Sequence, residues 1–305
     1  MHKSAIGMVF MIFATVLGFS ACTSTPTPAP EKIPVVATTS ILADVVNQVG
    51  GDLVSITTLV PPGSSAHEYQ PSPRDIAAVS DAALVFEVGL GLEEFMGTII
   101  LNAGTQVTPV NVSDDVVTRE FTGGQDEHFS ADPHVWLDPA NVIIWVQNIE
   151  STLSAYDPAH RDVYSANSAA YIEELQSLDQ WIVEETSLIP PGNRLIVTDH
   201  MLFGYFAEKY DFTVVGAIIP SYSSAAEASA QDLAALEDAI TQYGVKAILV
   251  GDTVNPALAE RVAEDTGTEL VQFYTGSLSG PDGPAATYLD YMRYNVTTIV
   301  NALSD

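Results

Sequence analysis

The sequence predicts an α/β protein in which two doubly wound α/β lobes are joined by a long helical spine. Short apolar runs rich in β-branched residues alternate with helical patterns in residues 33–138 and again in residues 193–305. This alternation is typical of βαβ units that build a parallel sheet. Residues 139–192 carry apolar side chains mostly at helical spacing and no strand pattern. The 305 residues, of which 47% are hydrophobic, are enough for two folded lobes.

The first lobe, residues 33–138, is expected to begin on a buried strand. Its elements are predicted as strand 33–39, helix 41–49, strand 54–60, helix 72–82 and strand 83–88. The helix at 72–82 has the clearest start, because Ser72 can cap it and Pro73 suits the first helical position.

The spine and the second lobe complete the predicted fold. The spine, residues 139–192, is expected to form one or two long helices with a break at Asp157 and Pro158. The second lobe, residues 193–305, is predicted to contain strands at 194–198, 213–218, 245–250 and 270–274, and helices at 201–210, 229–244, 255–267 and 286–303. A long helical segment between two βα regions is a natural rigid connector.

The first 22 residues resemble a lipoprotein signal peptide. Lys3 precedes an apolar stretch, residues 5–19, that is too short to span a bilayer. Small residues then precede Cys22, as in a bacterial lipobox, so Cys22 is expected to carry lipid as the mature N-terminus. The alternative is an ordinary signal peptide with an incidental cysteine. Residues 23–32 are rich in Thr and Pro and are expected to form an extended tether.

The expected location is therefore extracytoplasmic, either lipid-anchored to the cell membrane or periplasmic. Cys22 is the only cysteine, which excludes a disulfide framework and a thiolate metal site. With 10 Lys and Arg against 39 Asp and Glu, the formal net charge is −29. Such a charge argues against nucleic acid as a partner and is a common adaptation for solubility.

Three of the six histidines occupy similar places in the predicted fold. His67 lies a few residues after the second strand, His134 lies just before the spine, and His200 directly follows the first strand of the second lobe. Loops at the carboxyl ends of parallel strands converge, and ligands bind there. Three imidazoles suit a borderline-soft cation, so they predict a metal site in the cleft between the lobes. The alternative is three unrelated histidines.

At these residues the chain resembles a known family. The matching motifs are HEYQPSPRD at 67–75, DPHVWLDP at 132–139, TDHMLFGYF at 198–206 and YLDYMRYNVTTI at 288–299. They are similar to the cluster A-I substrate-binding lipoproteins of zinc and manganese ABC importers, and the resemblance covers nearly everything from residue 33 onwards. It implies that His67, His134 and His200 bind one metal ion. It also implies that the chain catalyses no reaction and passes the ion to a membrane permease with its ATPase. The chain is expected to act as a monomer.

The identity of the metal and of the fourth ligand stays open in the sequence. Nitrogen ligands favour zinc over manganese, and His200 stands where manganese-type members often carry Glu. Gly276 stands where many members supply a ligand carboxylate. Water, Asp252, Asp199 or Glu68 could complete the site. His128, in an acidic loop at 123–132, is expected to be a loop histidine rather than an auxiliary zinc collector.

Two other functions are compatible with a metal site made of three histidines. A hydrolase could use a three-histidine zinc ion with an open position for water. However, the sequence has no HExxH helix, no GxSxG elbow and no phosphate loop. A metal-binding surface adhesin would share the fold and the site, and neighbouring genes for a permease and an ATPase would distinguish an importer from it.

Overall fold

The computed structural model describes residues 32–104, 108–119 and 131–304. The first lobe contains a four-stranded parallel sheet in the order β2-β1-β3-β4. Its strands are β1 (Ile33–Ala37), β2 (Val54–Thr58), β3 (Leu84–Glu87) and β4 (Val110–Asn111). Its helices are α1 (Ser40–Gly50), α2 (Pro73–Asp81) and α3 (Met96–Ala103), with a short 3-10 turn at Gly51–Leu53.

The sequence analysis missed α3 and β4. The strand β4 is only two residues long and has no alternating pattern that would reveal it. The predicted start of α2 is present: the Ser72 backbone N–H donates to the Asp75 carboxylate at 2.6 Å, and Pro73 is the first helical residue.

Two long helices form the spine. They are α4 (Pro139–Tyr156) and α5 (Arg161–Thr186), separated by the 3-10 turn Pro158–His160 at the predicted break. The Asp138 carboxylate accepts a hydrogen bond from the Ala140 N–H at 2.8 Å and thereby caps α4 directly after the segment that carries His134.

The second lobe repeats the strand order of the first. Its parallel sheet runs β6-β5-β7-β8. The strands are β5 (Leu195–His200), β6 (Thr213–Ile219), β7 (Ala247–Gly251) and β8 (Glu269–Phe273). The helices are α6 (Gly204–Tyr210), α7 (Ala230–Tyr243), α8 (Ala257–Thr266) and α9 (Tyr288–Leu303). The predicted fold class, with two α/β lobes and a helical connection, is confirmed.

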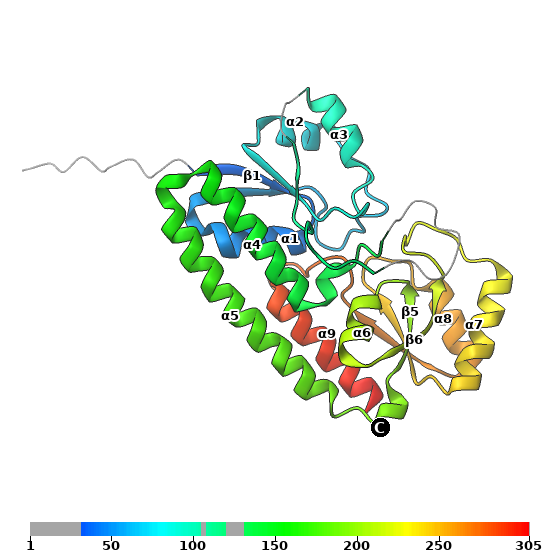
Figure 1. Ribbon diagram of the computed structural model, residues 1–305. Coiled ribbons are helices and arrows are strands. Elements are labelled where there is room, and N and C mark those ends of the chain that lie inside the picture. Colours follow the sequence, from blue (N-terminus) through cyan, green and yellow to red (C-terminus); the bar gives the residue numbers. More distant parts are fainter. Residues whose placement is uncertain (1–31, 105–107, 120–130, 305) are drawn as a thin grey trace, which may run out of the picture. The chain divides into compact units, whose positions relative to one another are not determined.

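The main hydrophobic core runs through both lobes and the spine. In Figure 1, α5 passes beside α1 of the first lobe and α9 of the second, and α5 packs against both helices. One cluster of buried side chains extends from β1 through α1, α4 and α5 to α9, and a smaller one lies where α7 and α8 cover the second sheet. Residues 32–305 form one compact unit.

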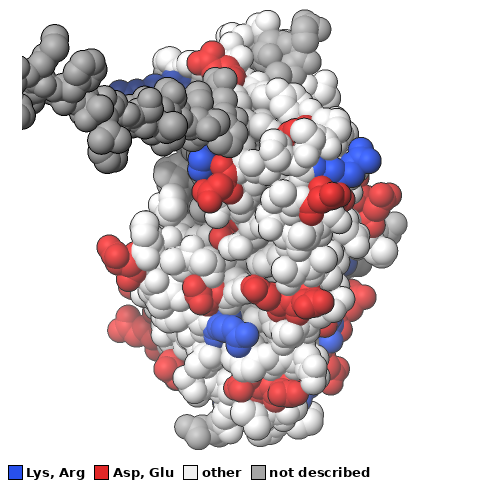
Figure 2. All heavy atoms as spheres, turned by 90° about the vertical axis from the view of Figure 1, so that its left-hand side faces the viewer, with Lys and Arg blue, Asp and Glu red and all other residues white. Residues whose placement is uncertain are grey.

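The acidic side chains are dispersed over the surface. On the face in Figure 2, Asp and Glu lie among uncharged residues and are more frequent than Lys and Arg. This distribution gives a diffuse negative field. None of the helices in the described part of the chain is long and apolar enough to cross a bilayer. The predicted signal peptide, Cys22, the tether up to residue 31 and His128 lie outside the described residues.

Candidate metal centre

In the second sheet, the strand order places the candidate site at a switch point. In each sheet the first strand lies between the second and the third, so successive connections leave it in opposite directions. At such a switch point, the loops that follow two neighbouring strands run in opposite directions. They leave room for a ligand at the carboxyl ends of the strands.

Each candidate ligand reaches the site from a different element. His200, expected directly after β5, is its last residue. His134 immediately precedes the 3-10 turn Val135–Leu137 that leads into α4. His67 lies in the loop between β2 and α2. The side chains of His134 and His200 are buried, and His67 is partly buried.

The structure brings the three imidazoles together. The Nε2 atom of His134 lies 3.3 Å from that of His67 and 3.2 Å from that of His200. One nitrogen from each of the three residues lies within 4.8 Å of the other two. Two nitrogen ligands of a tetrahedral zinc ion are separated by about 3.3–3.4 Å, because each zinc–nitrogen bond is about 2.0–2.1 Å long. Both distances to His134 are therefore close to those of a tetrahedral set.

Two buried carboxylates fix the orientation of the rings. Asp132 Oδ1 accepts from the His134 Nδ1–H at 2.9 Å, and Asp199 Oδ1 accepts from the His200 Nδ1–H at 2.5 Å. Because the proton is then on Nδ1, the Nε2 atoms of these rings face the site with free lone pairs. Sequence reasoning considered Asp199 only as a ligand and missed Asp132, although both are within two residues of a candidate ligand.

The space between the rings is small and enclosed. A cavity of about 20 Å³ is lined by the three histidines together with Ser65, Ala66, Leu92, Trp136, Thr253, Thr275 and Gly276. This volume is enough for one water-sized atom. The cavity therefore has room for one ion, but not for an extended substrate.

The proposed carboxylate ligands do not join this group. Asp252 is an exposed residue that lines another cavity, and its Oδ1 accepts from the Thr275 N–H at 3.4 Å. Glu68 is exposed and accepts from the Ser224 hydroxyl. Asp199 lies behind His200. Among the described residues, the only group of His, Cys, Asp or Glu side chains close enough to hold a metal is His67, His134 and His200.

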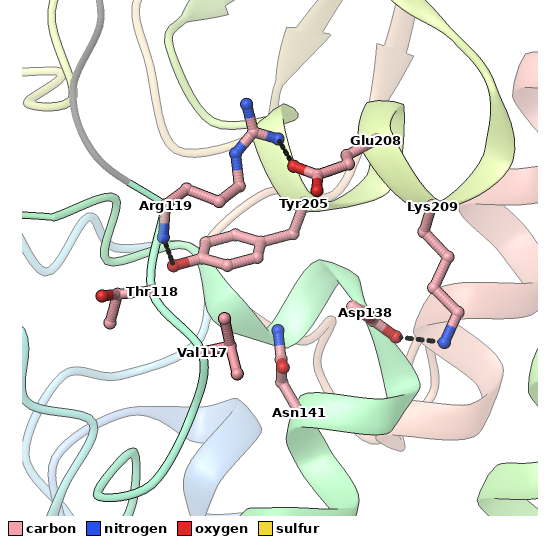
Figure 3. Close-up of a pocket in the computed structure, with 8 residues that line it drawn as sticks. All are labelled: Val117, Thr118, Arg119, Asp138, Asn141, Tyr205, Glu208 and Lys209. Atoms are coloured by element: carbon pink, nitrogen blue, oxygen red, sulfur yellow. Dashed lines mark hydrogen bonds and ion pairs between the residues drawn. The ribbon is translucent and has the colours of Figure 1, made fainter.

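A larger cavity lies elsewhere and its charges are paired. It has a volume of about 600 Å³ and is shown in Figure 3. Arg119 contacts Glu208 at 3.0 Å, and Lys209 contacts Asp138 at 2.7 Å. Because these charged side chains pair with one another, they do not point together at a common place where a ligand could bind.

The environment favours the neutral form of His67 and His134. Burial, and then the neighbouring His134 and His200 rings, lower the pKa of His67 well below 6.5. Burial and His200 likewise lower the pKa of His134. Burial raises the pKa of Asp132 to about 7, against the hydrogen bond from the His134 N–H and the charge of Arg119, which lower it. A neutral imidazole is the form that binds a metal ion.

These shifts predict how zinc binding depends on pH. Protons compete with the metal for the imidazoles, and an ordinary histidine would start to lose this competition near pH ~6.5. Because the folded-state pKa values of His67 and His134 are lower, we expect the affinity to change by less than about tenfold between about pH 7.5 and pH 6. Below about pH 6 it should fall steeply, which isothermal titration at a series of pH values would measure.

Two results would contradict this expectation. A loss of well over tenfold between about pH 7.5 and pH 6 would mean that the rings have ordinary pKa values. An affinity that stays flat to about pH 5 would mean that carboxylates dominate the site. His67 and His134 contribute to the stability of the unbound fold with the same sign: this contribution is lost as the pH falls below ~6.5, because the unfolded chain takes up their protons more readily. The raised pKa of Asp132 acts in the opposite direction.

The fold and the group of three histidines are those expected of one class of protein, a receptor that holds a metal ion between two α/β lobes. Residues 35–302 match the family described as ZnuA, the periplasmic component A of a zinc-uptake complex. The chain belongs to this family of metal-binding components of ABC importers, which are not enzymes. The hydrolase alternative is therefore wrong.

Individual relatives are similar over most of the chain. The manganese-binding lipoprotein MntA of Halalkalibacterium halodurans is 34% identical over 307 residues, with 100% of both chains covered. Among solved structures, the periplasmic zinc-binding protein TroA of Treponema pallidum has a TM-score of 0.83 and 26% identity. A manganese-bound periplasmic metal-binding protein of candidatus Liberibacter asiaticus has a TM-score of 0.79 and 28% identity. Both comparisons cover 90% of this chain and 100% of the other.

Proposed function

We propose that this chain captures one divalent metal ion through His67, His134 and His200, with zinc preferred over manganese, and delivers it to an ABC permease. The observation that supports this proposal is the convergence of three imidazole nitrogens on a cavity of about 20 Å³. The relatives are named for manganese and for zinc, so their names do not select the metal. The donor atoms favour zinc, because manganese prefers oxygen ligands.

We also infer that the fourth ligand is a water molecule. Zinc is usually four-coordinate in proteins. No acidic side chain of the described residues lines the cavity, and Gly276 at its wall has no ligand atom in its side chain.

The proposed anchor follows from the sequence of the first 22 residues. Lipid on Cys22 would hold the receptor at the outer face of the membrane that contains its permease. Mass spectrometry of the mature protein tests this part, because an unmodified N-terminus at another residue contradicts it.

Metal titration tests the binding function. We expect the soluble chain, residues 23–305, to bind one Zn²⁺ per molecule in isothermal titration, because the three ligands form a single site. Manganese should compete only at a large excess over zinc. Absence of saturable zinc binding at neutral pH would refute the function, whereas tighter binding of manganese would refute the metal assignment alone.

A further inference from the structure

The cavity that would receive the cation is lined by uncharged groups. Besides the three histidines, the described residues at its wall are small, apolar or hydroxyl-bearing. A histidine binds a metal ion in its neutral form. A dication held by three neutral imidazoles and water would keep its full charge in a site shielded from solvent. Buried charges are costly unless an opposite charge lies near them.

A carboxylate lies directly behind His200. Asp199 Oδ1 accepts from the His200 Nδ1–H at 2.5 Å and from the His200 backbone N–H at 2.6 Å. Asp199 Oδ2 accepts from the Gly251 N–H at the end of β7, also at 2.6 Å. Only 5% of the side chain is exposed. Three N–H donors therefore hold this carboxylate at the switch point of the second sheet.

Asp132 occupies a similar place behind His134 but differs in its surroundings. Its Oδ2 is buried without a hydrogen-bond partner in the described structure, and the Arg119 guanidinium lies close enough to act on its charge. Within the described part of the chain, the only basic group that forms an ion pair with Asp199 is His200. Among the described residues, no Lys or Arg forms an ion pair with Asp199, whereas the charge of Arg119 acts on Asp132.

We propose that Asp199 supplies, through the His200 ring, the negative charge that the lining of the cavity lacks, and that it thereby sets the zinc affinity. This inference rests on the proposed metal-binding function. Asp199 acts as a positioning residue: it holds the His200 tautomer and makes its Nε2 a stronger donor to a cation. Asp199 contacts the Nδ1 side of His200 and does not line the cavity.

A double-mutant cycle distinguishes an effect of the Asp199 charge on zinc affinity from an effect of Asp199 on the local structure alone. Asp199→Asn removes the charge, and Gly276→Asp places a carboxylate at the wall of the cavity. A Cβ atom at Gly276 would have no heavy atom of another residue within 4 Å, so the second change is sterically possible. Zinc affinity of residues 23–305 is measured by competition with a fluorescent zinc chelator for the wild type, both single variants and the double variant.

We expect Asp199→Asn to weaken zinc binding by about 10–100-fold, the usual range for outer-shell partners of a metal ligand. We also expect Gly276→Asp to improve zinc affinity at least about tenfold more in the Asp199→Asn background than in the wild type, because the new carboxylate replaces a missing charge. If Asp199→Asn acted only by displacing the His200 ring, a carboxylate on another loop would not restore zinc affinity.

Controls keep the outcomes distinct. Asp211→Asn removes the same charge from a side chain that is 93% exposed, at a left-handed position that suits Asn, and should leave affinity unchanged. If Asp199→Asn does not fold, Asp199→Ser replaces it, because its hydroxyl is an uncharged acceptor. An unchanged affinity in the Asp199 variant overturns the inference, as do additive effects of the two substitutions. Absence of zinc binding by the wild type would instead refute the proposed function.

Discussion

Replacing His134 with alanine is expected to reduce zinc affinity by more than about 100-fold, beyond the range for outer-shell partners. His134 is the central ligand of the candidate site, since its Nε2 lies within 3.3 Å of the corresponding atoms of both other histidines. Without this side chain, only the nitrogen donors of His67 and His200 remain, and the space between them is empty. Isothermal titration of the variant and the wild type, both as residues 23–305, measures the loss.

His160→Ala is a matched control for this experiment. His160 is the last residue of the turn between α4 and α5, with 42% of its side chain exposed, and it pairs with Asp157 rather than with the site. This variant should bind zinc as the wild type does. A His134→Ala protein that is folded and binds zinc with unchanged affinity would show that the ion binds elsewhere.

A carboxylate introduced at Gly276 is expected to change the metal preference. Gly276→Asp would add a carboxylate at the wall of a cavity in which histidines are the only residues with a titratable side chain. Manganese prefers oxygen ligands and a higher coordination number. We therefore expect the ratio of manganese to zinc affinity to rise at least about tenfold, which corresponds to about 1.4 kcal/mol. Competition titrations with both metals measure this ratio.

Two further variants complete the comparison. Gly280→Asp adds the same charge in the same loop at another open position, and should not change the ratio. Asp252→Asn tests the competing ligand and should leave zinc affinity nearly constant, because Asp252 is exposed at another cavity. An unchanged metal ranking in Gly276→Asp, together with a large loss in Asp252→Asn, would reject a site completed by water.

The sequence predicts the fold well where the signals are local. Buried parallel strands appear as apolar runs, and the spine is recognisable because its helices are long and the break contains Pro158. By contrast, β4 has only two residues, and its pairing with β3 depends on contacts distant in the sequence. The continuous core was not predicted either, since periodicity shows which side of a helix is buried but not what covers it.

The three histidines of the site could also be selected from the sequence, because each lies beside a predicted strand end or the start of the spine. Their mutual distances could not, since neighbouring ligands are 66 and 67 residues apart. Asp252 illustrates the limit of the strand-end argument. It follows β7 directly, yet it lies at a different cavity. What a residue contacts depends on the direction of its side chain as well as on its position along the strand.

The continuous core also restricts how an ion can enter and leave. Beside the site, the Tyr288 hydroxyl donates to the Trp136 carbonyl at 2.7 Å, and the Trp136 indole N–H donates to the Thr275 carbonyl at 3.2 Å. Rotation of one lobe away from the other as a rigid body would break these buried bonds and the packing of α5 against α1 and α9. Exchange of the ion therefore favours a local route, in which the exposed loop that carries His67 moves while the spine keeps both lobes in place.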